Sequence, residues 1–239
     1  MTKKLATWAG VDEKSILGKD LFLYVRDKGR RGGADRELMI SPRLDDLECV
    51  YASLEGFLAA EPGEHISVCA VFDNEEVGSH TKQGAASTFL RDTLERIGEA
   101  LGKTGSGYRR MLAQSFMISA DNAHGLHPNH PEKSDPAVKP YLNRGIVIKF
   151  HGGQKYTTDG YSEAVMRELC EKAQVPCQSY ANRSDIAGGS TLGNISAGQV
   201  SIPTVDIGLA QLAMHSAVES AGSMDVEYLI RALATFYRQ

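Results

Sequence analysis

The chain has 239 residues, which is enough for one sizeable α/β domain. Its hydrophobic content of 42% and charged content of 23% are those of an ordinary globular protein. A formal net charge of −4 gives no reason to expect nucleic acid or an anionic membrane as a partner.

The cysteines and the N-terminal residues indicate the compartment. The four cysteines lie far apart and no pair has CxxC spacing, which is typical of thiols in a reducing compartment. The first residues lack the apolar run of a secretion signal, and no apolar run approaches membrane-spanning length. We therefore expect a cytoplasmic protein that binds neither a membrane nor nucleic acid.

Apolar runs and residues at helical spacing predict strands that alternate with helices. The nearly apolar run 66–72 is typical of a central parallel strand. The alternation favours an α/β fold, a three-layer α/β/α sandwich around a mainly parallel sheet, in one domain over residues 1–239. The expected strands are 21–25, 38–40, 66–72, 115–119, 145–150, 177–181 and 204–207, and the expected helices are 47–58, 90–101, 162–174 and from 225 onward.

A pair of glutamates follows the predicted strand 66–72, in the sequence DNEEVGS. Adjacent carboxylates disfavour each other's ionised form, and a cation between them relieves this repulsion. On local grounds an acidic surface turn is the more common explanation. The alternative is that Glu75 or Glu76 binds a metal while its neighbour transfers a proton.

Acidic residues also follow other predicted strands, and their positions favour a metal site. Sites in open α/β sheets form beyond the carboxyl ends of strands, so these side chains are expected to meet at one edge. Several carboxylates in one crevice repel each other unless cations neutralise them. Carboxylates with one or two imidazoles suit zinc or manganese. The residues concerned are Asp45, Glu75, Glu76 and Asp121.

The histidines have unequal claims to such a site. His215 stands alone in a late segment of small and apolar residues, where a histidine is more often an ordinary buried residue than a ligand. His124, His127 and His130 crowd behind Asp121 and have the better local claim. The residues alone leave the choice of histidine open.

Four motifs together resemble one known family. They are SPRLDD from Ser41, DNEEVGS from Asp73, SADNAHGLHPN from Ser119 and QLAMHS from Gln211. In this order they resemble the aspartyl aminopeptidase family of dinuclear zinc metallopeptidases, from about residue 21 to the C-terminus. In that family the residue matching Asp45 bridges two zinc ions and the residue matching Glu75 is the general base. The resemblance also implies metal binding by Glu76, Asp121 and His215, and substrate contacts by His124, Lys149 and Tyr156.

The resemblance also implies that part of the family's fold lies outside this sequence. Family members are roughly twice this long, against a usual domain length of about 100–200 residues. They begin with strands that carry a His-x-Asp motif and then insert a β-rich domain used in oligomerisation. The sequence is therefore expected to be the C-terminal half of a catalytic domain. One zinc would keep Asp45, Glu76 and His215, while the other would keep only Asp45 and Asp121 and lack its histidine.

The sequence leaves three functions open. The first is an aminopeptidase that removes N-terminal Asp or Glu from peptides by metal-activated water and is impaired by truncation. The second is a related dinuclear glutamyl-type aminopeptidase or deacylase. The third is a non-catalytic metal-binding or assembly fragment of such a peptidase. An apolar sheet edge left without a neighbouring strand would in each case favour a homo-oligomer.

Overall fold

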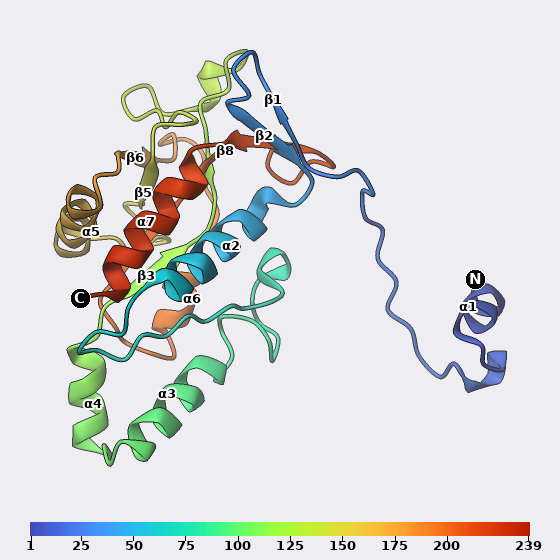
Figure 1. Cartoon of the computed structure of the whole chain (residues 1–239), viewed down its shortest axis with the longest axis horizontal. Coiled ribbons are helices and arrows are strands. Elements are labelled where there is room, and N and C mark those ends of the chain that lie inside the picture. The colour runs from blue at the N-terminus through green and yellow to red at the C-terminus, as the bar shows by residue number, and fades with distance from the viewer.

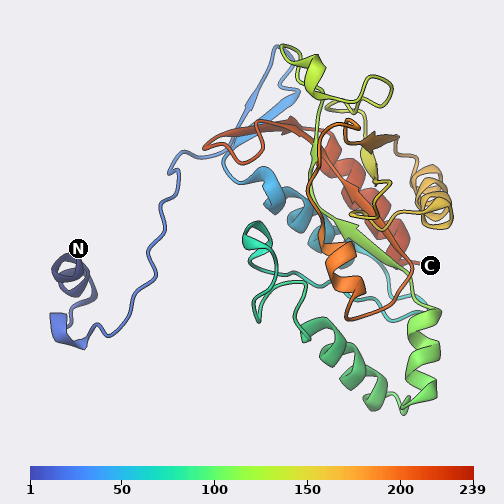
Figure 2. The ribbon, with the colours of Figure 1, turned by 180° about the vertical axis from the view of Figure 1, so that it is seen from behind.

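The computed structural model describes all residues from 1 to 239, and its first thirty or so residues stand apart from the rest. Helix α1 (Thr2–Ala9) and the short turn η1 (Glu13–Ser15) lie at the far end of an extended arm (Figure 1, Figure 2). The predicted strand 21–25 falls in this arm, where it is extended but unpaired, so the prediction is wrong. A strand needs a backbone partner. Without one, Phe22 and Leu23 remain 87% and 104% exposed.

The central sheet has four strands in the order β3-β7-β5-β6. β3–β7 and β5–β6 are parallel pairs, whereas β5–β7 is antiparallel. The α/β class is confirmed, but the prediction of a mainly parallel sheet is corrected to a mixed one. A buried strand has the same apolar character in either direction, so composition did not reveal the reversal. The strands are β3 (Met117–Ala120), β7 (Thr204–Gly208), β5 (Ile146–Phe150) and β6 (Cys177–Ala181).

A second sheet of five short strands lies at one end of the first, in the order β1-β2-β9-β8-β4. All its pairs are antiparallel except β4–β8. Only β2 was predicted, because the other members are too short to show an apolar period. The strands are β1 (Arg30–Gly32), β2 (Leu38–Ser41), β9 (Glu219–Gly222), β8 (Ala210–Leu212) and β4 (Ala123–His124).

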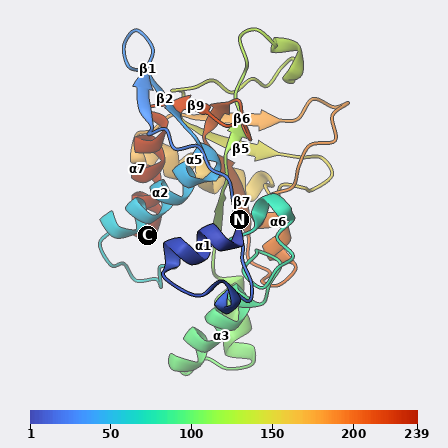
Figure 3. The ribbon, with the colours of Figure 1, turned by 90° about the vertical axis from the view of Figure 1, so that its right-hand side faces the viewer.

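Helices cover both faces of the central sheet (Figure 3). α2 (Leu44–Ala59) and α7 (Asp225–Tyr237) pack together on one face beside α5 (Gly160–Ala173), and α6 (Leu192–Ala197) lies on the other. A Cβ at Gly56 of α2 would lie 2.7 Å from Cβ of Leu233, so the close approach of α2 and α7 requires a glycine. No helix combines the length and apolar character that a membrane crossing needs.

The segment before the Glu-Glu pair differs most from its prediction. Residues 66–72 run extended from α2 toward α3 (Phe89–Ala100) and α4 (Ser106–Ala113) but form no strand. The predicted central strand is therefore wrong for this chain. The apolar pattern is present, but no segment lies beside it at hydrogen-bonding distance to complete a ladder.

Candidate metal centre

Loops from distant parts of the chain bring the predicted metal ligands together. Asp45 lies at the start of α2, and Glu76 lies in the short 3-10 turn η2 (Glu75–Val77). Asp121 directly follows β3, and His215 lies in the loop between β8 and β9. Asp121 and His215 therefore come from the ends of strands, Asp45 from the start of a helix and Glu76 from a short turn, and the first two positions are those expected for a site at a sheet edge.

Asp45, Glu76 and His215 form a first cluster whose ligand atoms all lie within 4.8 Å of one another. Nε2 of His215 lies 3.1 Å from Oδ2 of Asp45 and 3.2 Å from Oε2 of Glu76. Zinc bonds of 2.0–2.2 Å in a tetrahedron separate ligand atoms by about 3.4 Å. The first cluster therefore fits a zinc ion held by one imidazole and two carboxylates.

Asp45, Asp46 and Asp121 form a second cluster with the same spacing. Oδ1 of Asp46 is buried and has no hydrogen-bond partner. A buried carboxylate oxygen without a partner is costly, and a bound cation would remove that cost. The second cluster therefore fits a divalent cation with oxygen ligands. Asp45 belongs to both clusters, the position that a bridging ligand occupies.

Asp46 was not predicted as a ligand. Acidic residues are favoured at the start of any helix by the helix dipole, so the position of Asp46 just before the predicted helix 47–58 gave no separate sign of a metal. The Asp-Asp pair that it forms with Asp45 was the available signal, and the peptide bond between the two residues is cis.

Burial and, after it, mutual repulsion raise the pKa of the carboxyl groups in the metal-free protein. Burial, followed by the charges of Asp121 and Glu76, raises the pKa of Asp45 to about 7. The same three causes raise the pKa of Glu75 to about 7. Burial and the charge of Asp121 also raise the pKa of Asp46 well above its usual value. The site thus concentrates negative charge that a cation would stabilise.

We expect the metal-free protein to lose stability as the pH rises. The pKa values of Asp45 and Glu75 are near 7 when folded and near 4 when unfolded, so the folded state binds more protons between these values. The stabilisation is complete below about pH 4 and is lost as the pH rises through about 7. Between pH 5 and 8 we expect a loss on the order of a few kcal/mol, measured as a falling Tm in EDTA. Zinc should restore the Tm at pH 8. A Tm in EDTA that stays constant or rises between pH 5 and 8 would contradict the raised pKa values of these carboxyl groups.

The three predicted substrate contacts lie in different environments. Nζ of Lys149 lies 3.3 Å from Oδ2 of Asp121 and 5.4 Å from the ring centre of Tyr156. Burial lowers the pKa of Lys149, but the charge of Asp121, together with those of Tyr156 and Asp206, outweighs burial and raises it. Lys149 and Tyr156 are 2% and 6% exposed, so both lie behind the second cluster. Their contact with substrate remains a prediction.

His124 is the exposed member of the predicted substrate contacts. Loss of hydration, followed by the charges of Lys149 and His215, lowers the pKa of its imidazole. The ring is therefore near the site and accessible from outside it. Neither observation tests its contact with substrate.

Glu219 is a further residue of the site that the sequence did not reveal. It lies on β9, is 2% exposed, and accepts hydrogen bonds from two backbone N–H groups. These belong to Asp45, at 3.0 Å, and His215, at 2.8 Å. One buried carboxylate thus fixes the backbone of two ligands that are far apart in sequence. A single acidic residue among small residues gave too weak a signal to single it out.

Replacing Glu219 by Gln is expected to weaken zinc binding about 10- to 100-fold while the fold is retained, as when an outer partner of a metal ligand is lost. The glutamine amide keeps the size but turns one acceptor into a donor that faces a backbone N–H. Competition with a chelating dye measures the zinc affinity. The matched control is Glu227→Gln on α7, whose side chain is exposed. An unchanged zinc affinity in Glu219→Gln would show that these hydrogen bonds do not position the ligands.

Comparison with known proteins identifies the family. The profile of the family described as aminopeptidase I zinc metalloprotease (M18) matches residues 1–237. The probable M18 family aminopeptidase 2 of Clostridium acetobutylicum is 48% identical over 237 residues, covering 99% of this chain and 55% of that protein. Its namesake in Mycobacterium leprae is 41% identical over 233 residues, covering 98% of this chain and 55% of that protein. The chain spans about half the length of these relatives.

Solved structures agree with the sequence comparison. An M18 aminopeptidase from Thermotoga maritima superposes with a TM-score of 0.89 at 25% identity, over 99% of this chain and 54% of that one. Yeast aminopeptidase 1 superposes with a TM-score of 0.85 at 30% identity, over 99% of this chain and 55% of that one. The family resemblance inferred from the four motifs is confirmed. This chain belongs to the M18 family of zinc aminopeptidases.

Proposed function

We propose that this chain carries the metal-binding core of an aminopeptidase that removes N-terminal Asp or Glu from peptides. The observation that carries the proposal is the position of Asp45, which is shared by two ligand clusters beside Glu75. Metal-dependent aminopeptidases use two ions about 3.5–4 Å apart, so a shared carboxylate is what such a site needs. The M18 relatives, which are zinc metallo-hydrolases, support the same reaction class.

The residues would divide the chemistry between them. Asp45, Glu76 and His215 would hold one zinc ion, and Asp45, Asp46 and Asp121 would hold the other. Bound zinc supplies Lewis-acid polarisation of the peptide carbonyl and lowers the pKa of water. Glu75 would accept a proton from the attacking water and return it to the leaving amine.

The preference for acidic N-terminal residues is the finer part of the proposal. It is supported by the resemblance to aspartyl aminopeptidases and by the exposed His124 near the charges of Lys149 and His215. An imidazole N–H at that place could donate a hydrogen bond to a substrate carboxylate.

Hydrolysis of aminoacyl p-nitroanilides by the zinc-loaded chain tests this function. We expect kcat/KM to be highest for aspartyl and glutamyl substrates, with turnover lost in EDTA and restored by zinc. Faster hydrolysis of leucyl or lysyl substrates would contradict the acidic preference. An absence of hydrolysis for all substrates, with zinc binding intact, would overturn unaided activity.

A non-catalytic metal-binding fragment is the second candidate. The second cluster contains three carboxylates and no imidazole, and the chain spans about half of its relatives. Zinc binding without turnover is the result that would favour this candidate. A glutamyl-type aminopeptidase or deacylase would instead hydrolyse glutamyl or N-acyl substrates in preference to aspartyl ones.

The proposal includes self-association in a reducing, cytoplasmic setting. The solved relatives include a dodecamer of aminopeptidase 1 from S. cerevisiae. The exposed apolar side chains of the arm would favour association here as well. All four cysteines are free, in keeping with a reducing compartment. A monodisperse monomer in light scattering would contradict the oligomer.

A further inference from the structure

Two of the four cysteines, Cys170 and Cys177, lie together at the edge of the central sheet that β6 forms. Cys170 lies in the last turn of α5, and Cys177 is the first residue of β6. The buried Cys170 belongs to the main hydrophobic core, and the partly buried Cys177 packs against that core. Their two thiols share a hydrogen bond. Cys177 pairs with Ile146 at the start of β5, whereas Lys149 of the metal centre lies near the end of that strand.

A tight connection returns the chain from α5 to β6. Gln174 ends the helix in the left-handed conformation, with a φ of 54°. The N–H of Val175 then donates to the carbonyl of Cys170 at 3.0 Å, and the carbonyl of Pro176 accepts from the first N–H of β5 at 3.1 Å. These contacts hold Cys177 beside the last turn of α5, so the two thiols meet without a rearrangement of the backbone.

The guanidinium group of Arg167 lies at the thiol of Cys177. Its Nη1 donates to Sγ of Cys177 at 3.6 Å, and its Nη2 donates to Oγ of Ser179 at 3.0 Å. Side chains two residues apart in a strand share a face, so the planar guanidinium spans both. Nε of Arg167 donates to Oε1 of Glu163, one turn earlier on α5, at 2.8 Å. These contacts fix a permanent positive charge beside Cys177.

Cys170 and Arg167 together favour the ionised form of Cys177. The hydrogen bond with Cys170, followed by the charge of Arg167, lowers the pKa of Cys177 to about 6. Burial and the charge of Glu163 oppose this shift without cancelling it. The shared hydrogen bond, with burial, raises the pKa of Cys170, which therefore keeps its proton. Reactive cysteines are partly exposed thiolates beside a cation, and Cys177 has this environment.

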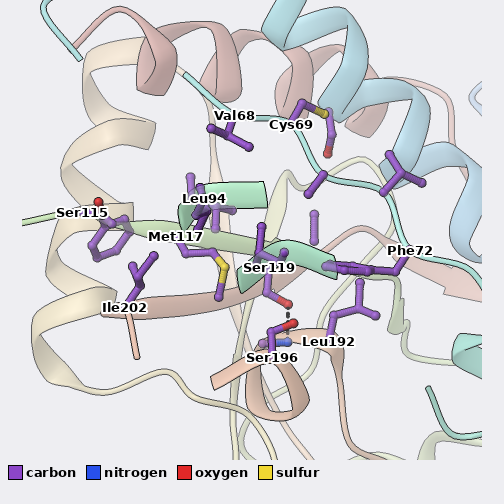
Figure 4. Close-up of a pocket in the computed structure, with 18 of the residues that line it drawn as sticks. Val68, Cys69, Phe72, Leu94, Ser115, Met117, Ser119, Leu192, Ser196 and Ile202 are labelled. Carbon is purple, nitrogen blue, oxygen red and sulfur yellow. Dashed lines mark hydrogen bonds between the residues drawn. The ribbon is translucent and has the colours of Figure 1, made fainter. Parts of the chain in front are cut away.

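Cys69 lies in a different environment and provides an internal reference. It lies on the extended segment 66–72, in a cavity of about 1260 Å³ beside β3 (Figure 4). The lining of this cavity includes Asp45 and Asp121, so the cavity belongs to the metal centre. Burial raises the pKa of Cys69, so its thiol is mostly protonated at neutral pH. Partial exposure alone therefore does not make a cysteine of this chain reactive.

We propose that Cys177 and Cys170 form a redox-active pair, in which Cys177, activated by Arg167, reduces a hydroperoxide and Cys170 then closes an intramolecular disulfide. The Cys177 thiolate attacks one oxygen of hydrogen peroxide. An S–O bond forms, the O–O bond breaks, and the leaving hydroxide takes a proton from water. The Cys170 sulfur then attacks the sulfenic sulfur, so that an S–S bond forms, the S–O bond breaks, and water leaves with the Cys170 proton.

The overall reaction oxidises two thiols to one disulfide and reduces hydrogen peroxide to two molecules of water. A dithiol reverses it by thiol–disulfide exchange. A transient, redox-sensing disulfide is the kind that occurs in a reducing compartment. The pair thus gives the chain a modification site that is separate from its metal centre.

Mass spectrometry of the full chain after treatment with equimolar hydrogen peroxide tests the pair. Trypsin cuts after Lys172, so a Cys170–Cys177 disulfide joins two peptides, and dithiothreitol should separate them. At pH 6 we expect Cys177 to be oxidised about tenfold faster than Cys69, because more of it is thiolate. Cys170→Ala should leave Cys177 as a sulfenic acid that dimedone labels. Faster oxidation of Cys69, or the absence of the disulfide in the unaltered chain, would overturn the proposal.

Two matched variants of α5 test the activation by Arg167. Arg167→Gln removes the charge beside Cys177, whereas Lys172→Gln removes an exposed charge from the same helix. Both residues pair with a glutamate one turn earlier, Glu163 and Glu168, at 2.8 Å. We expect the midpoint of the pH profile for iodoacetamide alkylation of Cys177 to rise by about one unit or more in Arg167→Gln only. The same midpoint in both variants would overturn the proposal. These readouts measure thiol chemistry, so they are independent of peptidase activity.

Discussion

Replacing Asp45 by Asn is expected to remove divalent-cation binding from both clusters at once. Asp45 is the only residue common to the two clusters, and the amide keeps its size but removes its charge. Loss of an outer partner of a metal ligand costs about 10- to 100-fold in affinity, so loss of a shared ligand should cost more than about 100-fold. Calorimetric zinc titration of the EDTA-treated variant measures the effect.

The matched control for this substitution is Asp73→Asn. Asp73 is exposed in the same acidic stretch as Glu76, but it belongs to neither cluster. Its carboxylate accepts only from the neighbouring N–H of Asn74, at 2.7 Å. Zinc affinity should therefore be unchanged in the control. An Asp45→Asn variant that binds zinc as the unaltered chain does would show that the clusters do not form one site.

Replacing Glu75 by Gln is expected to reduce turnover about 10²- to 10⁴-fold and to leave zinc binding intact. This is the usual contribution of a general acid–base residue. The amide keeps the shape of the side chain but cannot accept the proton of the attacking water. The measurement is kcat on an aspartyl p-nitroanilide with the zinc-loaded protein, alongside a zinc titration of the same sample.

The neighbouring Glu76→Gln supplies the contrast. Glu76 belongs to the first cluster, so its substitution should weaken zinc binding before any effect on proton transfer. Zinc affinity would then identify Glu76 as a metal ligand, and turnover with intact zinc binding would identify Glu75 as the base. Full turnover in Glu75→Gln would show that Glu75 is not the general base.

The sequence predicted those elements whose partners lie within the chain. The strand Cys177–Ala181 was expected over the same residues, and the last helix begins at Asp225 as expected. The runs 21–25 and 66–72 have equally good strand patterns but form no strand. A pattern shows the tendency of a segment, whereas a strand also needs a neighbour that offers backbone groups.

Only part of the site could be predicted from the sequence, because some of its contacts depend on segments that are far apart in the chain. The positions of Asp45, Glu76 and Asp121 after strands implied a common edge, and the structure brings them together. His215 had a weak local claim, yet the loop between β8 and β9 carries its ring to Asp45. Glu219 acts through backbone N–H groups of distant residues, and such a contact follows only from the three-dimensional fold.

The shared role of Asp45 is tested most directly by counting zinc ions per chain. Calorimetric titration of the metal-free protein should show one tightly held zinc, at the cluster that contains His215, and a second, weaker ion at the carboxylate cluster. Both should be lost in Asp45→Asn. The absence of specific zinc binding, or a stoichiometry that Asp45→Asn leaves unchanged, would contradict a metal centre built around this residue.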